Sequence, residues 1–271
     1  MTTATKTTDS AFEKGVRLME ALARSESAIG VTNLAEELTL TKSNVHRLLR
    51  SLVAMGYAHQ EPGTEHYFAT IKFWELGFRV ISRLEVRSFA LPYMRELAKI
   101  TNEQINLAVL DNEEIVYIDK IESTQAVHAP IRIGYRSPVY GVALGKAMLA
   151  YQSPLYVTHV LRNMRRFTSR TLSSPDALQK ELLRVRSAGY ATNKGEWREG
   201  VAGIAAPILA SPEHAVAAIG ISGPSERLRP KELTRYASIV IEAAKGISET
   251  LGYRSAQRKR KIGDRARRKA I

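Results

Sequence analysis

The sequence predicts an α+β protein with a small N-terminal domain and a larger C-terminal one. Apolar residues recur at helical spacing between Val31 and Tyr57, a strand–turn–strand pattern follows Gly56, and from Gln104 onward short β-rich runs alternate with helical segments. A chain of 271 residues suits domains of about 70 and about 170 residues. The predicted organisation is a disordered N-terminus at 1–10, a small domain at 11–70, a linker helix at 71–87, an α/β domain at 88–253 and a basic tail at 254–271.

Three helices are expected in the small domain. The first is predicted over Ala11–Arg24, and its inward residues are expected to be Phe12, Val16, Met19 and Leu22 or Ala23. The second is expected to start at Thr32, a residue type that caps helices, and to run to Leu38. After a turn at 39–41, the third helix carries one apolar stripe, made of Val45, Leu48, Leu49, Leu52 and Val53.

The polar face of the third helix has the composition of a DNA-recognition helix. Thr41 can cap this helix, and the side chains that follow are those that contact base edges and phosphates when a helix lies in the major groove. The residues predicted to bind DNA are Thr41, Lys42, Ser43, Asn44, His46, Arg47 and Arg50. Two helices joined by a short turn are typical of a helix-turn-helix.

A β-hairpin is predicted after Gly56, where two strand-forming segments flank a Pro-Gly turn. The helix pattern alone also fits an ordinary amphipathic helical hairpin. The hairpin directly after it favours a winged helix-turn-helix, with the hairpin as the wing.

The net charge of +13 is not evenly distributed. Residues 1–70 hold 7 basic and 8 acidic side chains, whereas residues 254–271 hold 9 basic residues and one Asp. A solvated, disordered end is the favoured interpretation of this tail, with a nonspecific phosphate-binding arm as the alternative. The absence of cysteine, of an apolar leader segment and of a membrane-spanning run favours a cytoplasmic protein with no membrane partner.

Residues 71–97 keep helical spacing of apolar side chains, with a break expected near Pro92. The first half is predicted to be a linker helix that pairs between subunits, because a dimer can read a two-fold symmetric DNA site. For Phe89–Leu97, packing against its own domain is an equally good interpretation.

The larger domain is predicted to be a sheet flanked by helices. Its strands are expected at Ile105–Leu110, Ile115–Ile121, Ala126–Ile133, Gly203–Leu209 and Ala215–Ser222. Its helices are expected at Ala143–Tyr151, Pro154–Asn163, Asp176–Ala188 and Pro230–Leu251. Ser174 before and Gly189 after the third of these are typical helix caps.

The segment Gly141–Lys146 opens a predicted helix with two glycines, and free N–H groups at a helix start attract a carboxylate. Tight packing of helix on sheet is the alternative reason for small residues there. The segment does not match a nucleotide-binding P-loop, because its first glycine is misplaced and Ala147 stands where that motif needs Ser or Thr.

The sequence gives little support for catalysis or a metal centre. Six histidines, His46, His59, His66, His128, His159 and His214, are scattered without metal-ligand spacing, and no GxSxG motif occurs. Solvated turns explain Asp111, Glu113 and Glu114, although an acid pair that includes Glu122 stays open. No catalytic residue, metal or cofactor is predicted.

Several stretches together resemble the IclR family of bacterial transcriptional regulators: LTKSNVHRLLRSLVAMGY, KFWELGFRV, GYRSPVYGVALGKAMLAY, GVAGIAAPIL and AAIGISGP. The resemblance covers about residues 11–252. It implies a winged helix-turn-helix joined by a linker helix to a GAF-like α/β effector-binding domain. It also implies homodimers or dimers of dimers that bind palindromic double-stranded promoter DNA under the control of a small organic acid.

The resemblance further implies an effector pocket. In it, the backbone amides of Ala143 and Leu144 would hold the acid and Ser222 would supply a hydroxyl. The chain departs from the family at Asn193, often Asp, at Gly195, commonly Glu, and at Gly203, often Cys, so the ligand is expected to be bulkier or more polar than the smallest acids. The complete predicted lining is Asn106, Tyr140, Ala143, Leu144, Asn193, Gly203, Gly220 and Ser222.

The predicted function is therefore a DNA-binding transcriptional regulator of a catabolic operon, with repressor favoured over activator. A small-molecule-binding or hydrolytic α/β domain with an accessory helix-turn-helix used for protein contact is the alternative.

Overall fold

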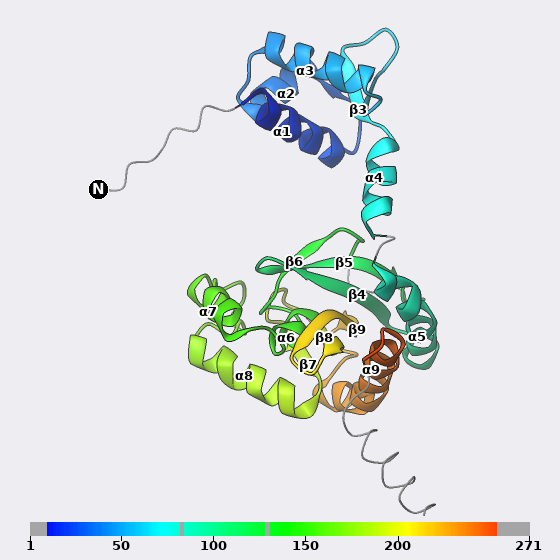
Figure 1. The fold of residues 1–271 in the computed structure, drawn as a ribbon, viewed down its shortest axis with the longest axis vertical. Coiled ribbons are helices and arrows are strands. Elements are labelled where there is room, and N and C mark those ends of the chain that lie inside the picture. The colour runs from blue at the N-terminus through cyan, green and yellow to red at the C-terminus, as the bar shows by residue number, and fades with distance from the viewer. Residues whose placement is uncertain (1–9, 82–83, 128–130, 254–271) are drawn as a thin grey trace, which may run out of the picture. The chain divides into compact units, whose positions relative to one another are not determined.

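The computed structural model describes residues 10–81, 84–127 and 131–253. The chain divides into two compact units between residues 83 and 84 (Figure 1). The predictions for residues 1–9, for His128 and for the basic tail lie outside the described residues.

The first unit contains three helices and a small sheet. Its elements are α1 (Ala11–Arg24), β1 (Ile29–Gly30), α2 (Val31–Leu38), α3 (Lys42–Ala54), β2 (Ala58–Gln60) and β3 (His66–Ala69). A capping box starts α1, because the Ser10 hydroxyl accepts the Glu13 N–H and the Glu13 carboxylate accepts the Ser10 N–H.

The buried face of α1 agrees with the prediction only in part. Leu22 is buried and Met19 packs half-buried against the core, as predicted, but Phe12 is 79% exposed and Val16 is 37% exposed. Leu18 and Ala21 are buried instead. The apolar residues of α1 are compatible with two overlapping faces, and contact with α2, α3 and β3 selects one of them. Val53, at the end of the predicted stripe of α3, is likewise 39% exposed.

Helix α2 is capped where the turn begins, and α3 is capped where the turn ends. Thr39 adopts a left-handed conformation (φ 57°) that ends α2, and the Thr41 hydroxyl accepts the Asn44 N–H at 3.3 Å to start α3. The cap of α2 is Gly30 rather than the predicted Thr32. The reason is β1, whose pairing with β3 holds Gly30 in extended backbone until the helix begins.

The predicted hairpin is present as β2 and β3, which pair antiparallel from Ala58↔Ala69 to Gln60↔Tyr67. The two-residue strand β1 adds to its other edge and gives the order β1-β3-β2. Gly63 takes a positive φ of 76° in the connecting loop, which is a conformation that favours glycine.

The helical region after the hairpin breaks earlier than predicted. It forms α4 (Lys72–Ile81) and α5 (Glu85–Thr101), and Pro92 lies inside α5. The exposed ring of Pro92 faces solvent, while Val86, Ala90, Met94 and Leu97 form one buried stripe. Burial of that stripe outweighs the hydrogen bond that proline cannot donate.

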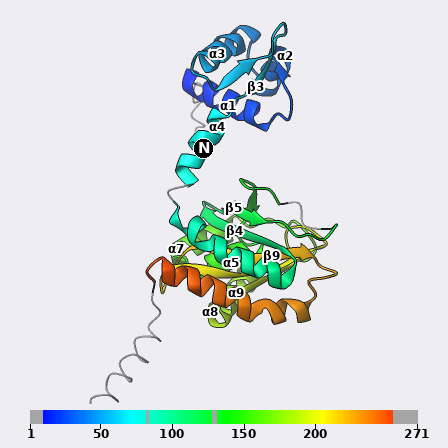
Figure 2. The ribbon, with the colours of Figure 1, turned by 90° about the vertical axis from the view of Figure 1, so that its right-hand side faces the viewer.

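The second unit is a six-stranded antiparallel sheet between two helical layers. The strands are β4 (Gln104–Asp111), β5 (Glu114–Ile121), β6 (Arg136–Pro138), β7 (Ala191–Lys194), β8 (Val201–Ser211) and β9 (His214–Pro224), in the order β6-β5-β4-β9-β8-β7. One face is covered by α5 and α9 (Pro230–Thr250), which lie side by side (Figure 2). The other carries α6 (Ala143–Leu149), α7 (Pro154–Arg162) and α8 (Pro175–Ala188).

Two strands differ from the prediction. In the described part of Ala126–Ile133 no strand forms, and the edge strand is β6 instead. The strand β7 was not predicted, because its four residues, Ala-Thr-Asn-Lys, carry almost no strand-forming side chains. Pairing with β8 holds it in the sheet.

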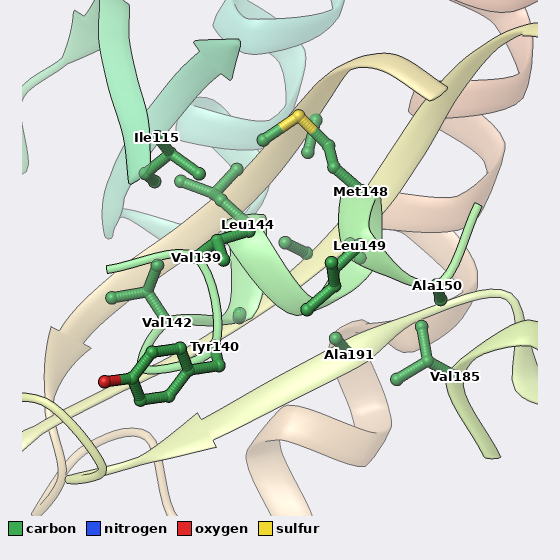
Figure 3. Packing of buried hydrophobic residues seen from close by; sticks show 14 of the residues in the cluster. Ile115, Val139, Tyr140, Val142, Leu144, Met148, Leu149, Ala150, Val185 and Ala191 are labelled. Carbon is green, nitrogen blue, oxygen red and sulfur yellow. The ribbon is translucent and has the colours of Figure 1, made fainter. Parts of the chain in front are cut away.

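The short helix α6 is buried along its whole length, and its neighbours in the core are drawn in Figure 3. A Cβ built on Gly145 would lie 2.0 Å from the carbonyl oxygen of Val139. Close packing of the helix on the preceding segment therefore requires the second glycine of the Gly141–Lys146 segment.

Candidate DNA-binding helix and ligand cavity

The two sides of α3 differ in burial and in charge. Val45, Leu48, Leu49 and Leu52 are buried in the core of the first unit. Of the residues predicted to bind DNA, Thr41, Lys42, Ser43, Arg47 and Arg50 are exposed, and Asn44 and His46 are half-buried. The helix carries no acidic residue, so its exposed face is cationic although residues 1–70 hold more acids than bases.

Two side chains on this face form hydrogen bonds with neighbouring residues of the helix or its cap. The Thr41 hydroxyl caps α3 and lies 3.2 Å from the Ser43 hydroxyl. Arg47 donates from Nη2 to the Asn44 Oδ1 at 3.3 Å, which orients the guanidinium along the exposed face. Within the described residues, neither Lys42 nor Arg50 forms an ion pair, so their charges are available to an anion.

The wing differs in charge from α3. Its loop exposes Glu61 and Glu65 and contains no Lys or Arg. The exposed cations of the helix-turn-helix are therefore concentrated on α3 rather than on the hairpin.

A cavity with an empty volume of about 540 Å³, part of it open to solvent, lies in the second unit beside the start of α6. Six of the eight residues predicted for the effector pocket line it: Asn106, Ala143, Leu144, Asn193, Gly203 and Ser222. Other lining residues that sequence reasoning missed include Tyr117, Trp197 and Arg198. No local pattern distinguishes these three residues from ordinary surface or core positions.

Strand register explains why the distant polar positions meet. Asn193 on β7 pairs with Gly203 on β8, Gly203 pairs with Ser222 on β9, and Ser222 pairs with Gln104 on β4. Directly opposed residues share a face of a sheet, so the row runs along one wall. Gly203 leaves a gap in the row, but the strands approach closely there, and a Cβ built on it would lie 2.7 Å from the Ile221 carbonyl oxygen.

A chain of hydrogen bonds leaves the Ser222 hydroxyl able to donate to a ligand. Gln104 donates from Nε2 to Asn106 Oδ1 at 2.8 Å, and Asn106 donates from Nδ2 to Ser222 Oγ at 2.8 Å. Because the Ser222 oxygen accepts this bond, its own O–H is free to be donated to a ligand oxygen.

The start of α6 offers backbone donors to the same cavity. The cap residue Val142 supplies no side-chain acceptor, and Ala143 and Leu144 are the first residues of the helix. The first N–H groups of a helix have no partner within it. These two residues therefore bring unpaired donors to the cavity wall.

The loop after β7 is fastened to α6 by a buried ion pair. Lys146 Nζ lies 2.6 Å from Glu196 Oε2 and 3.4 Å from Glu181 Oε1, and the Lys146 side chain is 1% exposed. The Glu196 N–H donates to Asn193 Oδ1 at 2.9 Å, which orients that amide. Burial raises the pKa of Glu196, whereas the charges and hydrogen bonds of Arg184 and Lys146 outweigh burial at Glu181 and lower its pKa.

The structure places Tyr140 and Gly220 outside the cavity lining. The Tyr140 hydroxyl donates to the Arg165 carbonyl at 3.1 Å and accepts the Arg165 N–H at 2.6 Å. Figure 3 shows this hydroxyl pointing away from Leu144 and Met148. Gly220 is covered by β8, since a Cβ there would lie 2.5 Å from the Ile204 carbonyl oxygen.

Within the described residues, no three side chains of His, Asp or Glu gather as ligands for a metal ion. None of the helices in residues 10–81, 84–127 and 131–253 is both long and apolar enough to cross a membrane.

A winged helix-turn-helix with a cationic third helix, followed by an α/β domain whose largely apolar cavity carries a few polar groups, defines a DNA-binding transcriptional regulator. Comparison with known proteins places the chain more narrowly. The model described as the IclR helix-turn-helix domain matches residues 11–62, and the model described as bacterial transcriptional regulator IclR C-terminal matches residues 78–249. The chain belongs to the IclR family of bacterial transcriptional regulators.

Relatives and solved structures agree with this assignment. The chain is 36% identical over 230 residues to the HTH-type transcriptional regulator KdgR of Escherichia coli K12, covering 84% of this chain and 88% of the relative. It is 31% identical over 244 residues to the transcriptional repressor IclR of the same organism, with 89% and 88% covered. These relatives are named as regulators and not as enzymes, so the hydrolytic alternative is not supported.

Two solved structures share the fold. The structure of Thermotoga maritima IclR matches with a TM-score of 0.77 and 27% identity, covering 89% of this chain and 98% of that one. An IclR homolog from Microbacterium hydrocarbonoxydans, solved in complex with 4-hydroxybenzoate, matches with a TM-score of 0.79 and 27% identity over 89% and 99% of the two chains.

Proposed function

We propose that this protein represses a catabolic operon and that a small organic acid controls its binding to promoter DNA. The observation that carries the proposal is the cavity of the second unit. In the part of the chain that the structure describes, its walls combine the free donors of α6 with one cationic side chain and no carboxylate. Such walls attract an anion of small size. The complex of a relative with 4-hydroxybenzoate supports an organic acid as that anion.

In the proposed DNA complex, α3 lies in the major groove. Lys42, Ser43, Arg47 and Arg50 are exposed and would contact bases and phosphates, with Asn44 and His46 beside them. Thr41 would act mainly by capping the helix. The acidic loop of the wing gives little attraction to phosphates, so sequence readout is assigned to α3.

In the proposed effector complex, the N–H groups of Ala143 and Leu144 and the Ser222 hydroxyl donate to the ligand. Asn106 positions Ser222, and Asn193 contributes a neutral amide where an Asp would repel an acid. The strands approach closely at Gly203, so the replacement of Cys by Gly adds little room, and the proposed effector is a small acid.

A homodimer, alone or as a pair of dimers, is proposed to bind a palindromic site. The support comes from α4, where Trp74 and Phe78 are 61% and 43% exposed and stack at 5.0 Å between ring centroids. Ile71 and Val80 extend the exposed apolar surface of this segment. Burying such a surface against a second copy is favourable, and a two-fold dimer matches a two-fold DNA site.

The DNA half is tested by selecting duplexes from a random pool with the full-length protein and measuring affinity for the selected site. Arg47→Ala is expected to weaken binding by about 1 to 3 kcal/mol if the guanidinium contacts a base, with a loss of site preference. Arg24→Ala is the matched control, because Arg24 is an exposed arginine of the same unit that pairs with Glu37 away from α3. Selection of no palindromic motif, or equal effects of the two variants, would refute this half of the proposal.

A further inference from the structure

We propose that Arg198 is the counter-ion of the effector's carboxylate and the residue that makes this cavity select an acid over its neutral analogue. The inference rests on the proposed function and names the chemistry of the same cavity.

Among the described residues that line the cavity, Arg198 is the only charged one. The remaining polar side chains of the described lining are neutral: the amides of Asn106 and Asn193, the Ser222 hydroxyl, the Tyr117 phenol and the Trp197 indole. The structure gives no ion pair between Arg198 and an acidic side chain of the described residues, so its positive charge lacks a protein partner there. A half-buried guanidinium beside an apolar cavity is stabilised by an anion that enters it.

Two aromatic rings hold the guanidinium in place. Its central carbon lies 4.3 Å from the ring centroid of Trp197 and 5.5 Å from that of Tyr135. Cation–π contacts of this kind orient the group without neutralising its charge. Arg198 is half-buried and lines the cavity, and its partner Tyr135 is 42% exposed, so the cation is accessible to a ligand in the cavity.

The charge of Arg198 also reaches the interior of the cavity. Tyr117 is a buried lining residue, and burial raises the pKa of its phenol, while its hydrogen bond with Ser137 and the charge of Arg198 act in the opposite direction. Because Tyr117 and Arg198 line the same cavity, a ligand bound there lies within the field of the guanidinium.

Contacts of Glu196 hold the loop that carries Arg198 in place. Glu196, two residues earlier, is tied to Lys146 of α6 and to Asn193 of β7. The fixed loop keeps Trp197 and Arg198 at the cavity, so the cation is present before the ligand arrives. The neutral donors of the same cavity would bind hydroxyl or keto oxygens, and the ligand class is a small carboxylate that carries one or more of them.

A ligand-independent test uses the fluorescence of Trp197. The chain has two tryptophans, so Trp74→Phe leaves Trp197 as the only one. In that background we compare quenching by iodide, an anion, with quenching by neutral acrylamide. Arg198→Gln is expected to lower the iodide quenching constant about twofold or more and to leave the acrylamide constant nearly unchanged, and Arg198→Lys is expected to restore iodide quenching.

The matched control is Arg162→Gln. Arg162 and Trp197 line a second, open hollow of the same unit, which does not include Arg198. If Arg162→Gln lowers iodide quenching as much as Arg198→Gln does, or if neither does, the cavity is not the anion site and the proposal is overturned.

The binding test uses pyruvate and 4-hydroxybenzoate, with 4-hydroxybenzamide as the neutral analogue. Arg198→Gln is expected to weaken acid binding about tenfold or more and to remove the preference for acid over amide, with Arg198→Lys intermediate. Equal acid binding by the wild type and Arg198→Gln overturns this inference but leaves the proposed function standing. If the wild type binds neither acid, the effector half of the proposed function fails, and the iodide result alone decides whether Arg198 makes an anion site.

Discussion

At the scale of single residues, the sequence and the structure indicate different roles for Lys146. In the sequence it ends a Gly-rich segment that suggests contact with an anionic ligand. In the structure it is 1% exposed, and its ammonium group is bound by Glu196 and Glu181. The partners lie 50 and 35 positions away in the chain, so no local pattern indicates the pairing.

Lys146→Met is expected to destabilise the second unit by about 3 to 5 kcal/mol, because it leaves Glu196 buried without its cation. Lys146→Met combined with Glu196→Gln is expected to recover much of that loss, since no unpaired charge remains at Glu196. Urea unfolding followed by circular dichroism measures both values.

The control for this prediction is Arg235→Met, which breaks an exposed pair with Glu232 on α9 and is expected to cost less than about 1 kcal/mol. If Lys146→Met lowers the free energy of unfolding no more than the control does, the buried pair stabilises the protein no more than an exposed pair.

At the scale of elements, several helix starts follow short-range rules, whereas the buried face of α1 and the course of α5 do not. Ser10, Thr41, Ser153 and Ser174 each accept a backbone N–H at the start of a helix, as their residue types predict. The buried face of α1 and the course of α5 through Pro92 depend instead on what packs against them. Local propensity is weak against the burial of several apolar side chains.

The exposed apolar surface of α4 is predicted to form the subunit contact. Trp74→Ser with Phe78→Ser is expected to shift the sedimentation-equilibrium mass from at least twice the chain mass of 30.1 kDa toward one chain. Leu183→Ser is the control, because Leu183 is an equally exposed apolar residue on α8, at 66%. A mass that stays unchanged in the double variant would remove α4 from the interface.

At the scale of the whole molecule, regulation requires that binding of the acid at one site changes the free energy of DNA binding at the other. The cationic helix α3 belongs to the first unit and the cavity to the second, and the chain joins these units between α4 and α5. An acid can change DNA affinity only to the extent that it binds the two DNA-binding states differently.

The expected coupling is a change of about 5- to 150-fold in operator affinity on saturation with an effector acid, corresponding to about 1 to 3 kcal/mol. Because linkage is reciprocal, operator DNA must change the affinity for the acid by the same factor. Titrations of acid with and without the selected duplex measure both factors. An acid that binds in the cavity and leaves operator affinity unchanged would contradict control by that ligand.

Much of the candidate site was predictable, but by different routes. The exposed face of α3 follows from the period of its apolar residues, because a helix that buries one stripe must expose the rest. Asn193, Gly203 and Ser222 were predicted from family resemblance, and strand register explains why they meet. Arg198 and Trp197 were missed, because a loop has no periodicity that tells which side chains turn inward.

The sequence by itself determined the fold class, the helix-turn-helix with its wing, the caps of α3 and α8 and most strands of the sheet. Each of these depends on residues a few positions apart, where backbone geometry and the alternation of apolar side chains act directly. Only the tertiary structure decided which face of α1 is buried, that α5 continues through Pro92, that Lys146 pairs with Glu196, and that Arg198 lies on the cavity wall. These outcomes depend on contacts between segments far apart in the chain, whose free energy exceeds the local preference at each position.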